Sequence, residues 1–188
     1  MNAKSKKWLA FLGVLFFVAL WIFILRLFTP TEIISRMGVN NIYIILFLIA
    51  SIGGVSSFTA SSYYVAIPIL VAGGLDPLIL AFIGGTGITI GDSLFFYLGK
   101  KGRSISSTEF YNKTEKFVNW INRSPKGVVP LGVYFFTGFT PLPNDLLTIP
   151  LGYSGYPYKK IILPLWLGNI TATLLLALVS IYGINWLF

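Results

Sequence analysis

The sequence contains no cysteine and no histidine, and only 6 of its 188 residues are acidic. The absence of cysteine excludes disulfides, thiol nucleophiles and thiolate metal ligands, and the absence of histidine removes the imidazole base and the commonest zinc ligand. Proteolysis by a serine–histidine pair or by a zinc motif is therefore excluded. An aspartyl mechanism, which needs two acids, stays open, but we expect no enzyme, no metal and no cofactor.

Charged residues are also scarce, at 11% of the chain, whereas 55% of the residues are hydrophobic. A soluble domain of this size does not need so much apolar surface, so the composition predicts an integral membrane protein. Long apolar stretches favour helices over a barrel, whose strands alternate polar and apolar residues. The net charge of +8 does not indicate nucleic-acid binding, because the basic residues lie between apolar segments, where they orient the protein and meet anionic lipid.

Three apolar runs are long enough to cross a bilayer, and we expect one membrane domain over residues 1–188. The first run, 8–28, follows Lys4, Lys6 and Lys7 and reads as an N-terminal transmembrane helix without a cleavage site. The second transmembrane helix is expected over 77–99, where Asp76 and Pro77 form a typical helix start. The third is expected over 161–188.

Two further apolar segments, 42–76 and 127–158, are interrupted by glycine and proline. Each arm has 11 to 13 apolar residues, about half of the roughly 20 that a crossing helix needs. We therefore expect each segment to be a re-entrant helical hairpin followed by a transmembrane helix. The sequence AIPI with a later glycine (66–73) is echoed by TIPL with a later glycine (148–155), which indicates two repeats.

The distribution of positive charge supports this topology. The one hydrophilic loop, 100–126, is basic, and its capping box SSTE (106–109) precedes an amphipathic pattern that predicts a helix in the cytoplasmic interface. If both hairpins are re-entrant, 12 of the 14 basic residues lie on one side, as the positive-inside rule requires. The repeats then have inverted topology, in a multi-pass protein of the cell membrane with a cytoplasmic N-terminus and an external C-terminus.

Asp92 and Asp145 are the two acidic residues within apolar segments. Ionisable residues at membrane depth are costly and are candidate functional residues by default. We expect both, together with Asn144, to line a substrate or proton pathway. The alternative for Asp92 is a packing contact with backbone or Asn169. The alternative for Asp145 is an N-cap whose side chain binds amides of the following arm.

Prolines and hydroxyls add to this candidate pathway. Proline breaks the helical hydrogen-bond ladder, and the freed backbone groups must face protein or a watery cavity. In the hairpins these residues are Pro68, Pro141, Pro143 and Pro150, with Ser61, Ser62 and Tyr63 as hydroxyl donors. Helix capping is an equally good explanation of the serines. Gly84, Gly87 and Gly91 share one face of 77–99 and predict close helix packing, either within the protomer or between protomers of an oligomer.

Two motifs resemble those of the DedA or VTT (SNARE-associated Golgi protein) superfamily of membrane proteins. The segments are GFTPLPNDLLTIPLG (138–152) and GDSLFFYLGKKG (91–102), within a resemblance that spans residues 40–185. The resemblance implies opposed re-entrant hairpins and lipid movement, as a polyprenyl-phosphate flippase or a phospholipid scramblase. Bacterial members carry arginines where this chain has Gly138 and Asn144, and acids in the first hairpin. The chain thus resembles a divergent branch that lacks bidentate phosphate capture at this motif.

Three functions remain open. The first is a transporter that translocates a lipid or lipid-linked carrier, a phospholipid or polyprenyl phosphate, with protons coupled through Asp145 and Asp92. The second is a small-solute or ion transporter of the same architecture, which needs a closed aqueous cavity rather than a groove open to the bilayer. The third is a non-catalytic membrane scaffold that presents the 104–126 segment to partners.

Overall fold

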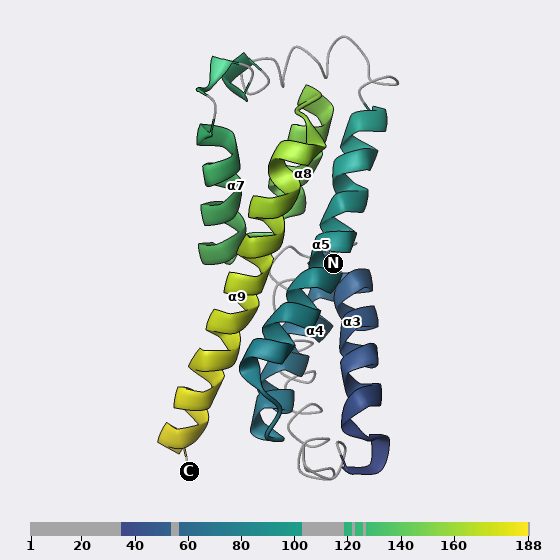
Figure 1. Ribbon diagram of the computed structural model, residues 1–188, viewed down its shortest axis with the longest axis vertical. Coiled ribbons are helices and arrows are strands. Elements are labelled where there is room, and N and C mark those ends of the chain that lie inside the picture. Colours follow the sequence, from purple (N-terminus) through teal and green to yellow (C-terminus); the bar gives the residue numbers. More distant parts are fainter. Residues whose placement is uncertain (1–34, 54–56, 103–118, 122, 126, 188) are drawn as a thin grey trace, which may run out of the picture.

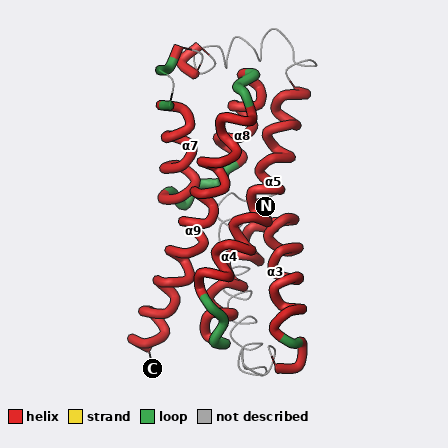
Figure 2. The backbone as a smooth tube through the Cα atoms, viewed as in Figure 1, coloured by secondary structure: helices red, strands yellow, loops and turns green. Residues whose placement is uncertain are grey.

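The computed structural model describes residues 35–53, 57–102, 119–121, 123–125 and 127–187 (Figure 1). These residues form helices and connecting turns, with no strand among them, which confirms the all-helical class (Figure 2). The predicted helix over 8–28 and most of the predicted amphipathic helix after residue 104 fall outside these ranges. The main helices are α3 (Val39–Gly53), α4 (Ser57–Ala72), α5 (Pro77–Gly102), α7 (Val128–Phe139), α8 (Asp145–Ser154) and α9 (Tyr158–Leu187).

Helices α5 and α9 run along most of the length of the molecule, and the shorter helices form two pairs (Figure 1). The pair α3–α4 lies at one end and the pair α7–α8 at the other, so that the two pairs occupy opposite halves. Helix α5 packs against α3, α8 and α9, whereas α9 also packs against α4 and α7. The C-terminal end of α3 and the turn from α7 to α8 both lie toward the middle of the molecule (Figure 1).

Two helices are long and apolar enough to cross a membrane, counted over the described residues. They are Pro77–Gly102 and Tyr158–Gly183, of 26 residues each. The four helices of the pairs have 10 to 16 residues. At 1.5 Å per residue the longest of them spans about 24 Å, less than the roughly 30 Å of a hydrocarbon core. The long helices extend beyond the predicted spans, to Gly102 in α5 and back to Tyr158 in α9.

The start of α5 is capped as the sequence predicts. The Asp76 carboxylate accepts hydrogen bonds from the backbone amides of Leu78 (2.7 Å) and Ile79 (3.2 Å). These amides have no partner within the helix, so the side chain satisfies donors that would otherwise be unpaired. Pro77 is the first helical residue, where its missing amide hydrogen is harmless.

The second helix of each pair ends in the same kind of turn. Gly74 has a φ of +87° and Gly155 a φ of +78°, a left-handed conformation that favours glycine. In both turns the next amide donates to the carbonyl five residues earlier, as in a Schellman motif: Leu75 to Leu70, and Tyr156 to Leu151. A proline follows in each case, and then the long helix. The two halves thus share a local structure as well as a sequence pattern.

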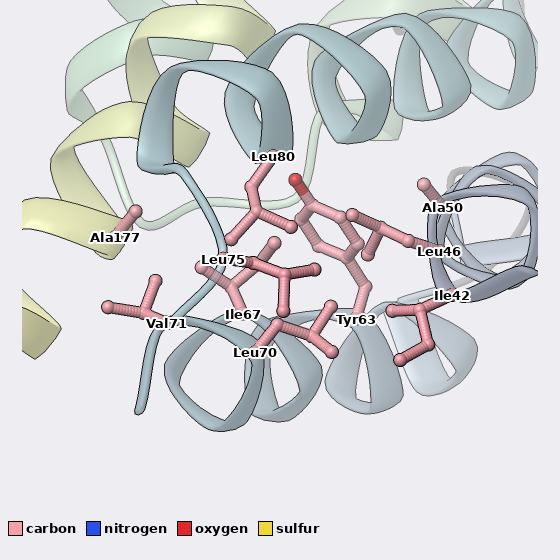
Figure 3. Packing of buried hydrophobic residues seen from close by; sticks show 10 residues of the cluster. All are labelled: Ile42, Leu46, Ala50, Tyr63, Ile67, Leu70, Val71, Leu75, Leu80 and Ala177. Carbon is pink, nitrogen blue, oxygen red and sulfur yellow. The ribbon is translucent and has the colours of Figure 1, made fainter. Parts of the chain in front are cut away.

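The apolar core has two parts, one in each half of the molecule. The first lies between α3, α4 and α5, where the ring of Tyr63 is surrounded by aliphatic side chains such as Leu46, Ile67 and Leu80 (Figure 3). The second joins α5, α7, α8 and α9, and its largest fully buried side chain is Phe96. Each helix pair therefore packs on α5 through its own cluster.

Glycines allow the helices to approach α5 closely. A Cβ added at Gly84 would overlap the Tyr63 ring of α4, and one at Gly87 would lie 2.6 Å from the Ala50 methyl group of α3. Gly91, on the same face, is buried. The glycine face predicted for this helix therefore makes contacts within the chain at Gly84 and Gly87.

Candidate functional site

Asp92 lies in the middle of α5 and is almost completely buried, with 2% of its surface exposed. Its Oδ2 atom accepts hydrogen bonds from the side-chain amides of Asn144 and Asn169, each at 2.8 Å. Asn144 directly precedes α8, and Asn169 lies in α9. One carboxylate thus joins three elements that are distant in sequence. Its hydrogen bonds come from neutral amides, which hold the carboxylate in place without cancelling a charge.

The two asparagines also bond to each other and to α5. Asn144 Nδ2 donates to Asn169 Oδ1 at 2.9 Å, and Asn169 Nδ2 donates to the Thr89 hydroxyl at 3.0 Å. Thr89 in turn donates to the carbonyl of Gly85, one turn earlier in α5. Asn169 is 1% exposed and Thr89 is 5% exposed. The site is a buried polar network whose members fix one another, which makes it sensitive to the loss of any one of them.

Asp145 is the first residue of α8, beside this network. The cap position belongs to Asn144, whose side chain makes no capping bond because it is turned toward Asp92. The backbone amides of Leu147 and Thr148 donate to the carbonyl of Asn144. Asp145 thus lies in the first turn of α8, one residue after the cap position. It is close enough to Asp92 for the two carboxylates to interact electrostatically.

A second polar contact connects the network to α4. The Tyr63 hydroxyl is hydrogen-bonded to that of Thr173 in α9, with the oxygens 2.5 Å apart, and Thr173 donates to the carbonyl of Asn169. The neighbouring Tyr64 is half exposed and interacts electrostatically with Asp92. The first helix pair therefore reaches the site through Tyr63 and Thr173, and the second pair reaches it directly through Asn144.

The remaining predicted pathway residues are spread over both pairs. Pro141 and Pro143 lie exposed in the turn between α7 and α8, next to Asn144. Pro68 and Pro150 lie inside α4 and α8, which continue through them, so the predicted helix breaks at these two prolines are wrong. The side chains of Ser61 and Ser62 fall outside the described part of the structure.

Beside the network, a groove of about 340 Å³ opens between α5 and α9. The apolar residues that line it are Ile90, Ile162 and Leu163. The other lining residues carry hydroxyl groups or an indole nitrogen; they are Thr86, Thr89, Ser93, Tyr158 and Trp166. Trp166 lies two turns inside α9, and its indole nitrogen donates to the Thr86 hydroxyl at 2.9 Å.

Sequence reasoning left Thr89, Thr173 and the groove out of the candidate site, but it named Asn169 as an alternative packing contact of Asp92, and that contact is present. The sequence nevertheless contains a pattern that indicates Thr89 and Thr173. Thr89 lies three residues before Asp92, and Thr173 lies four residues after Asn169, so each polar side chain has a polar neighbour on its own helix face. Polar residues that recur at helical spacing within an apolar segment indicate a polar seam between helices.

The fold and the site define an all-helical protein with two candidate membrane-spanning helices and a buried carboxylate between them. A family model for the VTT domain matches residues 58–182, which covers α4 to α9. The chain belongs to this family, the DedA/VTT family of membrane proteins. Comparisons with curated proteins and with solved structures find no match.

Proposed function

We propose that this protein translocates a lipid or a lipid-linked carrier across the bilayer, and that the Asp92 network is the point past which the polar headgroup moves. The observation that supports this proposal is the convergence of α5, α9 and the turn before α8 on one buried carboxylate. A buried acid is costly in a membrane protein and marks a substrate or ion pathway. Membership of a family generally regarded as transporters agrees with this role.

The architecture that suits this role is a pair of inverted repeats. In this arrangement α3–α4 and α7–α8 are re-entrant hairpins that enter the membrane from opposite faces, each followed by a crossing helix. Their placement in opposite halves, the short length of their helices and the shared turns at Gly74 and Gly155 support it. The positive charge of the neighbouring segments supports a cytoplasmic position for the ends of the α7–α8 pair.

Because the chain has no cysteine, single introduced thiols can test this orientation. Ala72→Cys places a thiol at the end of the first hairpin, and Lys160→Cys places one at the start of α9, directly after the second hairpin; both positions are exposed. A membrane-impermeant maleimide applied to intact cells should label the first variant and reach the second only after permeabilisation. Equal labelling of both variants in intact cells would contradict the inverted arrangement.

Proton coupling is part of the proposal, because two carboxylates that interact at membrane depth provide groups that can exchange a proton during transport. The test compares transport by Asp92→Asn and Asp145→Asn with transport by the unaltered protein from mildly acidic to mildly basic pH. We expect the pH dependence to be reduced in at least one variant. Unchanged rates and unchanged pH profiles in both variants would exclude coupling through these acids.

Reconstitution into vesicles tests the function itself. Acyl-labelled fluorescent phospholipids and a polyprenyl phosphate are followed as they move from the inner to the outer leaflet, with protein-free vesicles as the control. We expect faster movement of at least one lipid when the protein is present. A protein that moves no lipid but lets small solutes cross would be a solute transporter. One that moves neither, and whose function in cells survives Asp92→Asn but not changes in the 104–126 segment, would be a scaffold.

A further inference from the structure

Helix α9 has a face that α7 covers for only half of its length. Gly168 on this face lies against the carbonyl of Tyr134 and the side chain of Thr137 in α7. Seven and eleven residues after Gly168, on the same face, come Leu175 and Val179, which are exposed. Figure 1 shows α9 continuing past the lower end of α7, with no described helix on that outer side. The C-terminal half of this face is therefore bare.

We call this bare part the α9 strip, and its exposed members recur at helical spacing: Leu175, Leu178, Val179, Tyr182 and Gly183. On the other side of the helix, Ala177 is buried in the cluster of the first helix pair. A Cβ added at Gly183 would meet no atom within 4 Å. Glycine weakens a helix relative to alanine, and no contact among the described residues accounts for one here. In membrane proteins, small residues are typical of places where another helix approaches closely.

The turn from α7 to α8 starts at the lower end of α7, above the α9 strip, and needs cover of its own (Figure 1). Its residues Pro141, Leu142 and Pro143 are exposed, as is Phe139 at the end of α7. The turn lies in the middle of the molecule, between helices whose neighbours are long enough to cross a membrane. Irregular backbone at membrane depth is found only where protein or a water-filled cavity covers it. Lipid chains suit the α9 strip but not this turn.

The N-terminal segment of the same chain is badly placed to supply this cover. It joins the described part at residue 35, at the start of α3. Helix α3 packs on α4 and α5, and Figure 1 shows these helices between α3 and the α9 strip. The predicted helix over 8–28 is separated from residue 35 by 29–34, which span at most about 20 Å when extended. This tether keeps the predicted helix near α3.

A second copy of the chain fits the space with two-fold symmetry. The C-terminal end of α9 stands apart from the other described helices (Figure 1). A two-fold axis along the membrane normal brings the C-terminal halves of two α9 helices together, each strip against the other, below the α7 helices of both copies. The same patch is then used on both copies, as in most homodimers. Gly183 permits the close approach of the two helices.

We propose that the protein forms a symmetric dimer through its two α9 strips, and that the α9 helix of the partner covers the turn between α7 and α8. The turn leads directly to Asn144, which is bonded to Asp92, so the interface lies next to the polar network. The dimer does not depend on what the protein transports, and it stands or falls separately from the proposed function.

Single introduced thiols test the interface, because the chain has no cysteine of its own. One cysteine at a time is placed at positions 171–183, membranes that contain each variant are oxidised with copper phenanthroline, and the products are separated on a non-reducing gel. Near a two-fold axis each residue meets its own copy, within the short distance that a disulfide requires. We expect a shift to the dimer band with maxima at positions 175, 179 and 182, and none at the buried position 177.

Leu163→Cys is the matched control, since Leu163 is an exposed leucine of α9 outside the strip. We expect it to stay in the monomer band. Equal cross-linking at positions 163 and 179 would indicate random collisions and would overturn the proposal. A scan without any dimer band would overturn it as well. So would fast labelling of Val179→Cys by a membrane-impermeant maleimide, because the strip would then face water.

The mass of the protein in mild detergent, measured by light scattering after size exclusion, gives a test without cross-linking. We expect the unaltered protein to have the mass of two chains. Val179→Arg places a charge in the apolar interface and should shift the protein to the mass of one chain. Leu163→Arg places the same charge on α9 outside the strip and should leave the dimer intact. An unaltered protein with the mass of one chain, or a Val179→Arg dimer as stable as the Leu163→Arg dimer, would contradict the proposal.

Discussion

The closest contact between α5 and α8 provides a sharp prediction, the effect of Gly152→Ala. A Cβ at Gly152 would overlap the carbonyl oxygen of Phe96 and lie 2.9 Å from its carbonyl carbon and 3.0 Å from the amide nitrogen of Lys100. Ordinary van der Waals contacts at Cβ begin at 3.4 Å. All three of these atoms belong to the α5 backbone, so no side chain can rotate away. The two helices would have to separate by about half an ångström or more.

The expected destabilisation is that of an overpacked core, about 1 to 3 kcal/mol. For a chain of this length, such a change lowers the midpoint of thermal unfolding by roughly 2 to 12 °C on the scaling found for soluble proteins. Lipid transport should also fall, because Asn144 directly precedes α8 and its 2.8 Å hydrogen bond to Asp92 depends on where that helix lies. Thermal unfolding in detergent, followed by tryptophan fluorescence, measures the first effect.

Gly132→Ala is the matched control, since a Cβ at this position in α7 meets no atom within 4 Å. It introduces the same methyl group without a clash, and the better helix propensity of alanine contributes up to about 1 kcal/mol. We therefore expect an unfolding temperature equal to or above that of the unaltered protein. If Gly152→Ala is as stable as Gly132→Ala, the close packing of α5 and α8 described above is incorrect.

Three further substitutions test other contacts by the same unfolding assay. Asp76→Ala removes the cap of α5 and should destabilise by about 0.5 to 2 kcal/mol, whereas Asp76→Asn, which can still cap, should not. Tyr63→Phe removes a buried hydrogen bond to Thr173 and should destabilise the protein by about 0.5 to 1.5 kcal/mol. The control is Tyr64→Phe, at a side chain that is half exposed. Equal stability of the two variants would argue against the bond. Asn169→Leu leaves the buried Asp92 with fewer hydrogen-bond donors and should destabilise the protein by about 1 to 3 kcal/mol. A double-mutant cycle that combines it with Asp92→Asn measures the coupling energy between the two residues, and a coupling energy of zero would contradict their contact.

The helical segments could largely be predicted from the sequence because local signals fix them. The Asp76–Pro77 start, the short arms and the glycine at Gly155 depend on neighbours in the chain, although in the first repeat the left-handed turn falls at Gly74, one residue after the glycine of the sequence pattern. The prolines show the limit of such signals. Pro68 and Pro150 read as helix breaks, but each lies inside a helix that packs on its neighbours, α4 on α3 and α9, and α8 on α5. Tertiary packing outweighs one missing hydrogen bond.

The candidate site was harder to predict, because its partners are far apart in the sequence. Asp92 stood out as a charge in an apolar segment, but its bond to Asn144 spans 52 residues and its bond to Asn169 spans 77. The same distant contact sets the orientation of Asn144, whose side chain is bonded to Asp92 and makes no capping bond to α8.

The most direct test of the central claim is the rate at which a labelled phospholipid crosses vesicle membranes that contain Asp92→Asn, compared with vesicles that contain Asp76→Asn. Both substitutions replace one carboxylate by an amide, but Asp92 is buried in the polar network within α5, whereas Asp76 is an exposed cap that directly precedes α5. If the headgroup moves past Asp92, Asp92→Asn should slow the lipid about tenfold and Asp76→Asn should leave the rate unchanged. Equal rates in the two variants would contradict the account.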